Sequence, residues 1–273
     1  MIKQLEKKLN TDEDIEINQD ELNFMLQNIG SPDKQIRDEI IFSLFGKGFY
    51  TEAFEKEQVI EIYDYLINQN IIFEKIEEAD ILYALKRSFA ILLYSLIVTF
   101  GNKKEYKYFG ILSKGQTHKI LEEILKYIEK EKCTVGYSEQ YGWIDCFSHA
   151  SQLIIDLIKA DYEHSIFPNQ ILDSIYLSLI NQNSEFGDGQ EKRFAYIIAS
   201  LYKNGYIEHD EILEYIKKLG SYQREAKSFD IKNERCYENI LNTLNFFVLF
   251  INDGEIINLI KNLNNINEII SMI

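Results

Sequence analysis

The sequence predicts an all-α protein built of antiparallel helix pairs stacked in series. Apolar residues recur at helical spacing along most of the chain, and only 2 prolines and 13 glycines interrupt them. The connections between these periodic segments are short, which is typical of stacked helix pairs. A chain of 273 residues with 46% hydrophobic and 13% aromatic residues can bury a large core. We therefore expect one elongated helical solenoid over residues 1–273, to which residues 1–19 can add an N-terminal helical extension.

The first helices are marked by their start and stop residues. A charged helix is expected over residues 1–10, followed by an acidic segment. Helix resumes near residue 20 and ends at Gly30, a typical C-terminal stop. Ser31 and Pro32 then predict the start of a third helix, with Ser31 as its cap and Pro32 in its first position.

That third helix, up to residue 45, contains the step Ile36-Arg37-Asp38. The pattern resembles the second helix of a HEAT-type repeat, in which such Arg and Asp side chains connect neighbouring helix pairs. The resemblance implies a HEAT-like α-α superhelix and structural roles for Arg37 and Asp38.

The remaining helices follow from the same periodicity. No fixed repeat length is visible, which favours a degenerate solenoid over a regular array. Mixed charges and a single glycine predict an exposed loop over residues 219–234. The expected helices span residues 56–69, 76–101, 115–131, 142–160, 168–182, 189–204, 208–219, 234–252 and 254–271.

Charge and cysteine usage limit the functions to consider. The formal net charge is −15, from 44 acids and 29 bases, so direct nucleic-acid binding through a basic surface is not expected. The odd number of cysteines forms no CxxC pair, which fits a reducing compartment. The charged N-terminus lacks an apolar signal core, and the longest apolar run, residues 89–100, is too short for a membrane span. A cytoplasmic protein without membrane contact is expected.

One stretch, residues 136–152, brings unusual residue types together. Glycines punctuate a turn that leads into the helix expected from residue 142, with the only tryptophan, Trp143, near its start. Helical spacing places four polar side chains on one face. These are Asp145, His149, Gln152 and Asp156.

Asp145 and His149, one helical turn apart, can bind a metal ion or act as an acid–base pair. A third ligand has to come from another helix, and Asp188 or Glu191 are the candidates. The alternative is a polar helix face or a hydrogen-bonded histidine in a packed interface. No cofactor is required by the sequence.

Two further segments carry candidate binding residues. Arg87 and Ser88 enter a buried apolar helix, where they can hold an anionic ligand or pair with an acid on a neighbouring helix. Residues 186–193 form a glycine-bearing loop before a helix, with Asp188 and Arg193 as candidates. Its N–H groups can meet a phosphate, although its acids oppose one, and a capped turn followed by Glu–Arg pairing between helices is the structural alternative.

Other catalytic signatures are missing from the sequence. No nucleophile elbow, dinucleotide fingerprint or His-Glu-x-x-His pair is present. Cys146 lies beside His149, but a Cys–His nucleophile needs a distinctive exposed pocket. The remaining histidines stand alone and are expected at the surface: His118, His164 and His209.

Four motifs stand out: residues 30–40, Arg87-Ser88-Phe89-Ala90, Gly136-Tyr137 with Gly142-Trp143 and His149, and residues 186–195. Together they resemble a bacterial family, the domain-of-unknown-function family 2785, over roughly residues 20–250. The family typically has Arg-Gly followed by Gly-Trp-x-His-x-x-x-His-x-x-Asp, whereas Val135, Asp145 and Gln152 replace its Arg, first His and Asp here. The resemblance implies an all-helical, HEAT-like cytoplasmic protein of unassigned biochemical function.

These observations favour a non-enzymatic binding or scaffold protein of helical-repeat type that engages a protein or peptide. A metal-assisted hydrolase using Asp145 and His149 is the alternative from a different class. A third hypothesis is an acidic decoy that occupies a nucleic-acid-binding protein.

Overall fold

The computed structural model describes residues 1–78, 80–161, 166–225 and 231–271. Within these ranges the chain folds into α-helices and one two-stranded antiparallel sheet, which confirms the predicted all-α class. A π-helix, Gln35–Phe42, precedes α3, and a 3-10 turn, Ile71–Phe73, precedes α5. The strands are β1 (Tyr137–Ser138) and β2 (Gly142–Trp143). The α-helices are α1 (Ile2–Leu9), α2 (Gln19–Gln27), α3 (Ser43–Tyr50), α4 (Lys56–Asn68), α5 (Ile81–Gly101), α6 (Lys114–Lys130), α7 (Cys146–Ala160), α8 (Pro168–Ile180), α9 (Gln190–Lys203), α10 (His209–Glu225), α11 (Ile231–Val248) and α12 (Gly254–Ser271).

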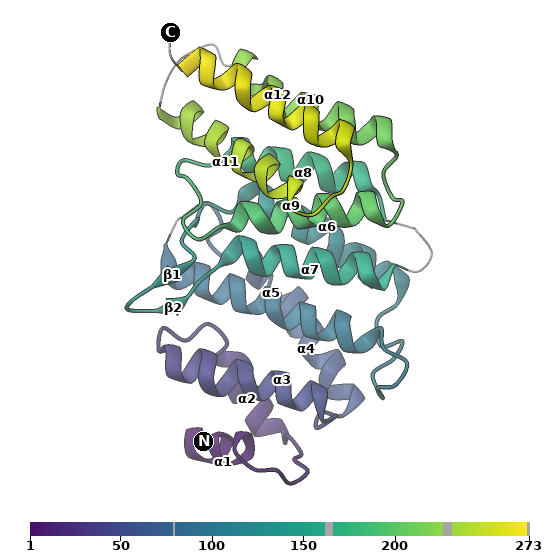
Figure 1. Ribbon diagram of the computed structural model, residues 1–273. Coiled ribbons are helices and arrows are strands. Elements are labelled where there is room, and N and C mark those ends of the chain that lie inside the picture. The colour runs from purple at the N-terminus through teal and green to yellow at the C-terminus, as the bar shows by residue number, and fades with distance from the viewer. Residues whose placement is uncertain (79, 162–165, 226–230, 272–273) are drawn as a thin grey trace.

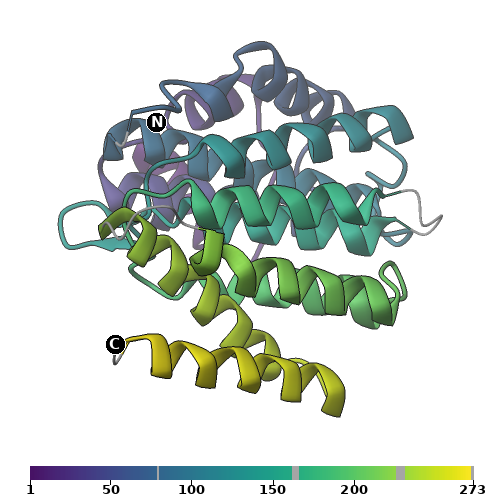
Figure 2. The ribbon, with the colours of Figure 1, turned by 90° about the horizontal axis from the view of Figure 1, so that it is seen from above.

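The helices are stacked in chain order from the N-terminus at one end to the C-terminus at the other (Figure 1). In one layer α5 packs on α7, α7 on α9 and α9 on α11, while α6 and α8 pack on each other behind them. Seen from above, many of these helices run along a common direction (Figure 2). Alternate helices of this part of the chain therefore share a layer.

Capping residues fix several helix starts. Asn18 with Glu21, and Ser113 with Gln116, form reciprocal capping boxes at α2 and α6. The helix predicted to start with Ser31 as its cap begins two residues later. Asp33 takes the capping role, because its carboxylate accepts the N–H groups of Gln35 and Ile36 at 2.9 and 3.4 Å.

Two predicted helices begin later than expected. The helix predicted from residue 76 starts at Ile81, where the Asp80 carboxylate accepts the Leu82 N–H at 2.8 Å. The helix predicted from residue 142 starts at Cys146, because Gly142 and Trp143 form β2 and Asp145 has a left-handed φ of +46°. Trp143 therefore lies on a hairpin that precedes α7, and the prediction that it lies on the helix was wrong.

The exposed loop predicted over residues 219–234 is also corrected. α10 continues to Glu225 and α11 begins at Ile231, so most of that range is helical. Gly220 is a packing residue: a Cβ at this position would lie 2.7 Å from the side chain of Leu263 on α12. The glycine allows two helices to approach closely, a role that the sequence cannot distinguish from a loop.

α5 forms the centre of the core and contacts α3, α4 and α7. By length and composition it is the one helix of the described residues that could cross a membrane, and most of its apolar window is buried against the rest of the protein. The core helix of a stacked protein passes the same test, because it is surrounded by apolar neighbours on several sides.

Candidate functional site

A β-hairpin connects α6 to α7 along the chain and projects from the stack of helices. β1 pairs with β2 through Tyr137 opposite Trp143 and Ser138 opposite Gly142. At its base the carbonyl oxygen of Gly136 accepts the N–H groups of Ile144 and Asp145, at 2.8 and 3.2 Å. Both views show the hairpin extending beyond the helix ends (Figures 1 and 2).

The hairpin presents aromatic side chains to solvent. Trp143 is 53% exposed and Tyr137 is 44% exposed, and their rings meet edge to face with centroids 5.2 Å apart. Val135, just before the hairpin, is also exposed. Large apolar side chains held outside the core are a common feature of binding surfaces.

Arg37 anchors the hairpin from the π-helix. Its guanidinium donates to the carbonyl oxygens of Tyr141 at 2.5 Å and Trp143 at 3.4 Å, and to that of Ser31 at 2.8 Å. The side chain is fully buried, and the guanidinium carbon lies 4.7 Å from the centre of the Phe89 ring. The prediction that Arg37 is structural agrees with these contacts.

Asp38 balances the buried charge of Arg37. The Arg37 Nε lies 2.7 Å from the Asp38 carboxylate. Burial lowers the pKa of Arg37 and raises that of Asp38, and the attraction between the two groups opposes both changes. Gly142, with φ of +77°, packs on this pair, since a Cβ there would lie 3.2 Å from the Asp38 carboxylate.

Ser88 and His149 hold the segment between the hairpin and α7. The Ser88 hydroxyl donates to the carbonyl oxygen of Ile144 at 2.5 Å and lies 2.6 Å from His149 Nδ1. Because a hydroxyl has one hydrogen, this network assigns the ring proton to Nδ1, which donates to Ser88. Ser88 is completely buried, and its hydroxyl connects the backbone of Ile144 to the ring of His149.

His149 is neutral in this environment. Burial, followed by the positive charges of Arg193 and Arg37, lowers its pKa to about 3. Its ring also meets Phe89 edge to face at 5.6 Å. A neutral histidine fixed by Ser88 corresponds to the hydrogen-bonded interface alternative of the sequence analysis.

The polar stripe predicted along α7 is divided in the structure. Asp145 precedes the helix, and its carboxylate lies 3.5 Å from the side-chain nitrogen of Gln190 on α9. Gln152 donates to Asp156 at 2.8 Å, so these two side chains pair with each other. Burial raises the pKa of both Asp145 and Asp156.

The glycine-bearing loop before α9 fixes the hairpin base from the other side. The Asp188 carboxylate accepts the N–H groups of Gly136 and Tyr137 at 3.0 and 3.2 Å. A Cβ at Gly136 would lie 2.4 Å from this carboxylate, so only glycine fits there. Asp188 therefore binds protein backbone N–H groups, which corresponds to the structural alternative for this loop.

The structure shows other surroundings for Glu191 and Arg193 than the Glu–Arg pairing between helices that was considered for this motif. Glu191 is buried and accepts a hydrogen bond from Asn242 on α11 at 3.3 Å. Arg193 is exposed, and its charge acts on Asp145 and His149. Arg193 is therefore an exposed cation close to Asp145 and His149.

Arg87 forms the ion pair that the sequence analysis proposed. Its guanidinium binds both carboxylate oxygens of Glu131 at 2.8 Å, with both side chains completely buried. Although burial alone lowers the pKa of Arg87, its hydrogen bond and charge pairing with Glu131 raise it. Arg87 also donates to the carbonyl oxygens of Glu74 and Lys75, at 2.9 and 3.2 Å.

The described part of the chain contains no group of three His, Cys, Asp or Glu side chains that could hold a metal ion. The two proposed third ligands have other partners, since Asp188 binds the hairpin backbone and Glu191 binds Asn242. The metal and hydrolase hypotheses for Asp145 and His149 remain predictions.

The other histidines, which were expected alone at the surface, differ in their surroundings. His209 is not isolated: its ring lies 3.1 Å from the Tyr202 hydroxyl, 3.2 Å from Glu255 and 3.4 Å from Asp253. His118 is partly buried, and His164 lies outside the described residues.

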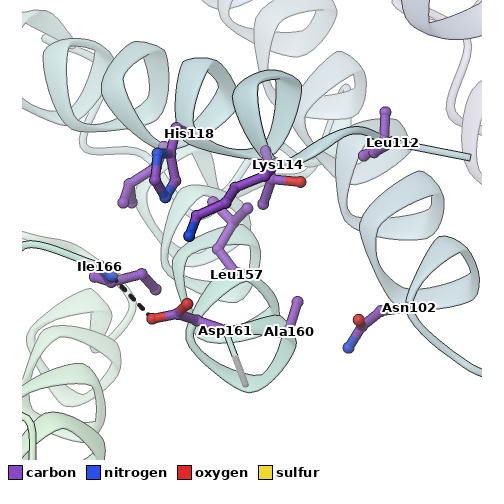
Figure 3. Close-up of a pocket in the computed structure, with 10 residues that line it drawn as sticks. Asn102, Leu112, Lys114, His118, Leu157, Ala160, Asp161 and Ile166 are labelled. Carbon is purple, nitrogen blue, oxygen red and sulfur yellow. Dashed lines mark hydrogen bonds between the residues drawn. The ribbon is translucent and has the colours of Figure 1, made fainter. Parts of the chain in front are cut away.

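His118 lines a pocket that the sequence analysis missed, between the end of α5, the start of α6 and the end of α7 (Figure 3). Its volume is about 250 Å³. Lys114 and His118 lie one turn apart on α6 and face Asp161 across the pocket. The spacing of Lys114 and His118 is the only signal of this pocket in the sequence. The lining residues are Asn102, Leu112, Lys114, Thr117, His118, Leu121, Leu157, Ala160, Asp161 and Ile166.

The fold and the site define an all-helical protein in which a buried polar network supports a projecting aromatic hairpin. The family described as "Protein of unknown function (DUF2785)" matches residues 72–251, which is more than half of the chain. The chain belongs to this family. The match includes the hairpin, Ser88, His149 and Asp188, whereas Arg37 and the rest of residues 30–40 lie before it. No curated protein and no solved structure matches the chain.

Proposed function

We propose that the chain is a non-enzymatic binding protein of HEAT-like helical-repeat type, which engages a protein partner through the hairpin of residues 137–143. The observation that carries this proposal is the exposed pair Tyr137 and Trp143 on a hairpin whose backbone is fixed by the buried Arg37 and by Asp188, which is exposed.

The arrangement of the polar motif supports binding over catalysis. Arg37, Ser88 and Asp188 each direct a polar group at backbone atoms of the hairpin or its base. A catalytic group needs access to a substrate, whereas Arg37 and Ser88 are completely buried. The network gives the hairpin a fixed conformation before a partner arrives, which reduces the entropy cost of binding.

The chemistry of the surface indicates the kind of partner. Tyrosine and tryptophan are the residues most enriched at the centres of protein interfaces, where they fill apolar pockets. Glu139 is exposed in the same hairpin, and the net charge of the chain is −15. We infer a partner with an apolar pocket for the indole and a basic rim, because opposite charges accelerate and orient association.

The proposal is tested by crosslinking from inside the hairpin. A photo-reactive phenylalanine replaces Trp143 in one sample and Tyr50 in another, in cells of the source organism. Tyr50 is a matched control, because it is 68% exposed on α3 and lies outside the hairpin. A protein crosslinked only from position 143 is then purified, and its affinity for the unlabelled chain is measured.

Support requires that this protein binds wild type at least about 30-fold more tightly than it binds Trp143→Ala, as expected for a central interface residue. Tyr50→Ala should bind as wild type does. Equal affinities of wild type and Trp143→Ala for every crosslinked protein would refute the hairpin as the binding element.

A further inference from the structure

The pocket at the end of α7 is remote from the hairpin. The hairpin precedes the first residue of α7, whereas Ala160 and Asp161 line the pocket at the other end of this 15-residue helix. At a rise of about 1.5 Å per residue, α7 separates the two by on the order of 20 Å. The pocket is therefore a feature that the proposed hairpin interface does not use.

One part of the pocket is apolar. Leu121 of α6, Leu157 of α7 and Ile166 line it, and all three side chains are buried. The volume of about 250 Å³ exceeds the roughly 150 Å³ that accommodates benzene. In proportion, the pocket has room for a molecule of about ten non-hydrogen atoms.

The charged side chains of the pocket lie at two helix ends of opposite polarity. Lys114 is the first residue of α6 and His118 follows one turn later, so both are near the positive end of that helix dipole. Asp161 caps the C-terminus of α7, where the dipole is negative. Lys114 and His118 face Asp161 across the pocket (Figure 3).

This placement is the reverse of the one that stabilises helices. Acids are favourable near a helix N-terminus and bases near a C-terminus, yet the first turn of α6 holds Lys114 and no acid, and Asp161 follows α7. Each charge adds to the polarity of its helix end. One wall of the pocket therefore favours an anionic group, and the facing wall favours a cationic group.

The charged groups have hydrogen-bonding capacity for a ligand in addition to the contacts that they make within the protein. The Asp161 carboxylate accepts the N–H of Ile166 at 2.8 Å, which fixes its orientation (dashed line in Figure 3). A carboxylate has about four acceptor positions and an ammonium has three donors. Asp161 and Lys114 can therefore each bind a further group from the pocket.

We propose that this pocket binds a free α-amino acid with an aliphatic side chain, such as leucine. Its carboxylate lies toward Lys114 and the start of α6, its ammonium toward Asp161, and its side chain on Leu121 and Leu157. An α-amino acid carries both charges on groups joined to one carbon atom, and leucine is close to the size that the volume allows. This inference goes beyond the proposed binding function and does not depend on it.

The test is isothermal titration calorimetry of the full chain with leucine, isoleucine, valine and methionine. The tightest of them should bind at a single site. Two probes resemble leucine but carry one charge, 4-methylpentanoate and 3-methylbutylamine. Each should bind at least about 10-fold more weakly, because it leaves one charged wall without a partner. Binding of either probe as tightly as the amino acid, or no saturable binding of any amino acid up to about 10 mM, would overturn the proposal.

Variants locate the binding in this pocket. Lys114→Met removes the cation, and Asp161→Asn removes the negative charge while its amide oxygen can still accept the Ile166 N–H. Each should weaken binding at least about 10-fold. Lys119→Met is the matched control, because this lysine is exposed on α6 and does not line the pocket, and it should bind as wild type does. Unchanged binding by both Lys114→Met and Asp161→Asn would overturn the proposal.

A third variant keeps the test decisive if Asp161→Asn does not fold. Ala160→Phe adds a ring to the pocket without removing a charge. It should abolish binding of the amino acid, and circular dichroism verifies that the variant is folded. A folded Ala160→Phe protein that binds as wild type does would place the amino acid elsewhere and contradict the proposal.

Discussion

The guanidinium of Arg37 donates a hydrogen bond to the carbonyl oxygen of Tyr141 at 2.5 Å, although the two residues are 104 positions apart in the sequence. This contact connects the N-terminal helices to the hairpin that precedes α7. The second anchor, Asp188, reaches the same hairpin from the loop before α9. The conformation of a short loop thus depends on residues from two distant parts of the chain.

Replacing Arg37 should destabilise the protein strongly. Arg37→Met removes the hydrogen bonds from a buried guanidinium to the hairpin carbonyl oxygens, and the loss of hydrogen bonds to a charged group costs about 1.5–3 kcal/mol each. The free energy of unfolding, measured by urea denaturation with circular dichroism, reports this loss. The exposed Arg193→Met is the control and should change stability by less than about 0.5 kcal/mol. Similar values for both variants would contradict the anchoring role of Arg37.

The Arg87–Glu131 pair makes a separate prediction. Arg87→Met should cost about 3–5 kcal/mol, because the Glu131 carboxylate stays buried without its partner. Adding Glu131→Gln should recover part of the loss, since the neutral amide oxygen can still accept the N–H groups of Lys132 and Cys133. Denaturation of both variants gives the comparison. A double variant less stable than Arg87→Met would argue against an uncompensated charge as the cause.

Gly136 tests how closely the hairpin base approaches Asp188. Gly136→Ala places a Cβ within 2.4 Å of the carboxylate, which forces the two loops apart, and we expect a loss of about 1–3 kcal/mol. Gly115→Ala is the matched control, because nothing lies within 4 Å of its Cβ and it is inside α6. Alanine there should raise stability by about 0.5–1 kcal/mol. If Gly136→Ala is as stable as wild type, the close approach is not a constraint.

The low pKa of His149 gives a pH dependence with a definite sign. The native state keeps this ring neutral down to about pH 3, whereas the unfolded chain takes up the proton near its ordinary pKa of 6.5. Between these values the unfolded state holds more protons, so the free energy of unfolding falls as the pH decreases. The slope is at most about 1.4 kcal/mol per pH unit.

Buried carboxyl groups act in the opposite direction, because burial raises the pKa of Asp145 and Asp156 and protonation then favours the native state. The measurement is therefore a comparison with His149→Asn, whose amide can donate to Ser88 but does not titrate. Between about pH 7 and about pH 4, wild type should lose more stability than this variant. Parallel stability profiles would show that His149 does not carry the effect.

The sequence was sufficient to predict most of the helices. Apolar spacing and capping residues located segments such as α6 and α8 within a few residues of their observed ends, since both signals are local. The ion pair of Arg87 with an acid was also predictable in kind, because a buried charge needs a partner. The identity of that partner, Glu131, depended on tertiary structure.

The hairpin was not predictable from local signals. Its strands are only two residues long, and long-range bonds from Arg37 and Asp188 hold them, so the helical periodicity of α7 was extended incorrectly through Trp143. Asp145 adopts a left-handed conformation that non-glycine residues rarely show, and no pattern marked it. Gly220 suggested a loop because the sequence alone does not distinguish a glycine that allows close helix packing from a glycine that ends a helix.

Arg37 and Asp188 hold the hairpin backbone, so Trp143 should be held rigidly while its indole stays exposed. Trp143 is the only tryptophan, so time-resolved fluorescence anisotropy with acrylamide quenching observes it alone. We predict an indole that acrylamide quenches readily and whose anisotropy decays at the slow rate of the whole protein. A quencher-protected indole, or a decay dominated by fast local motion, would contradict it.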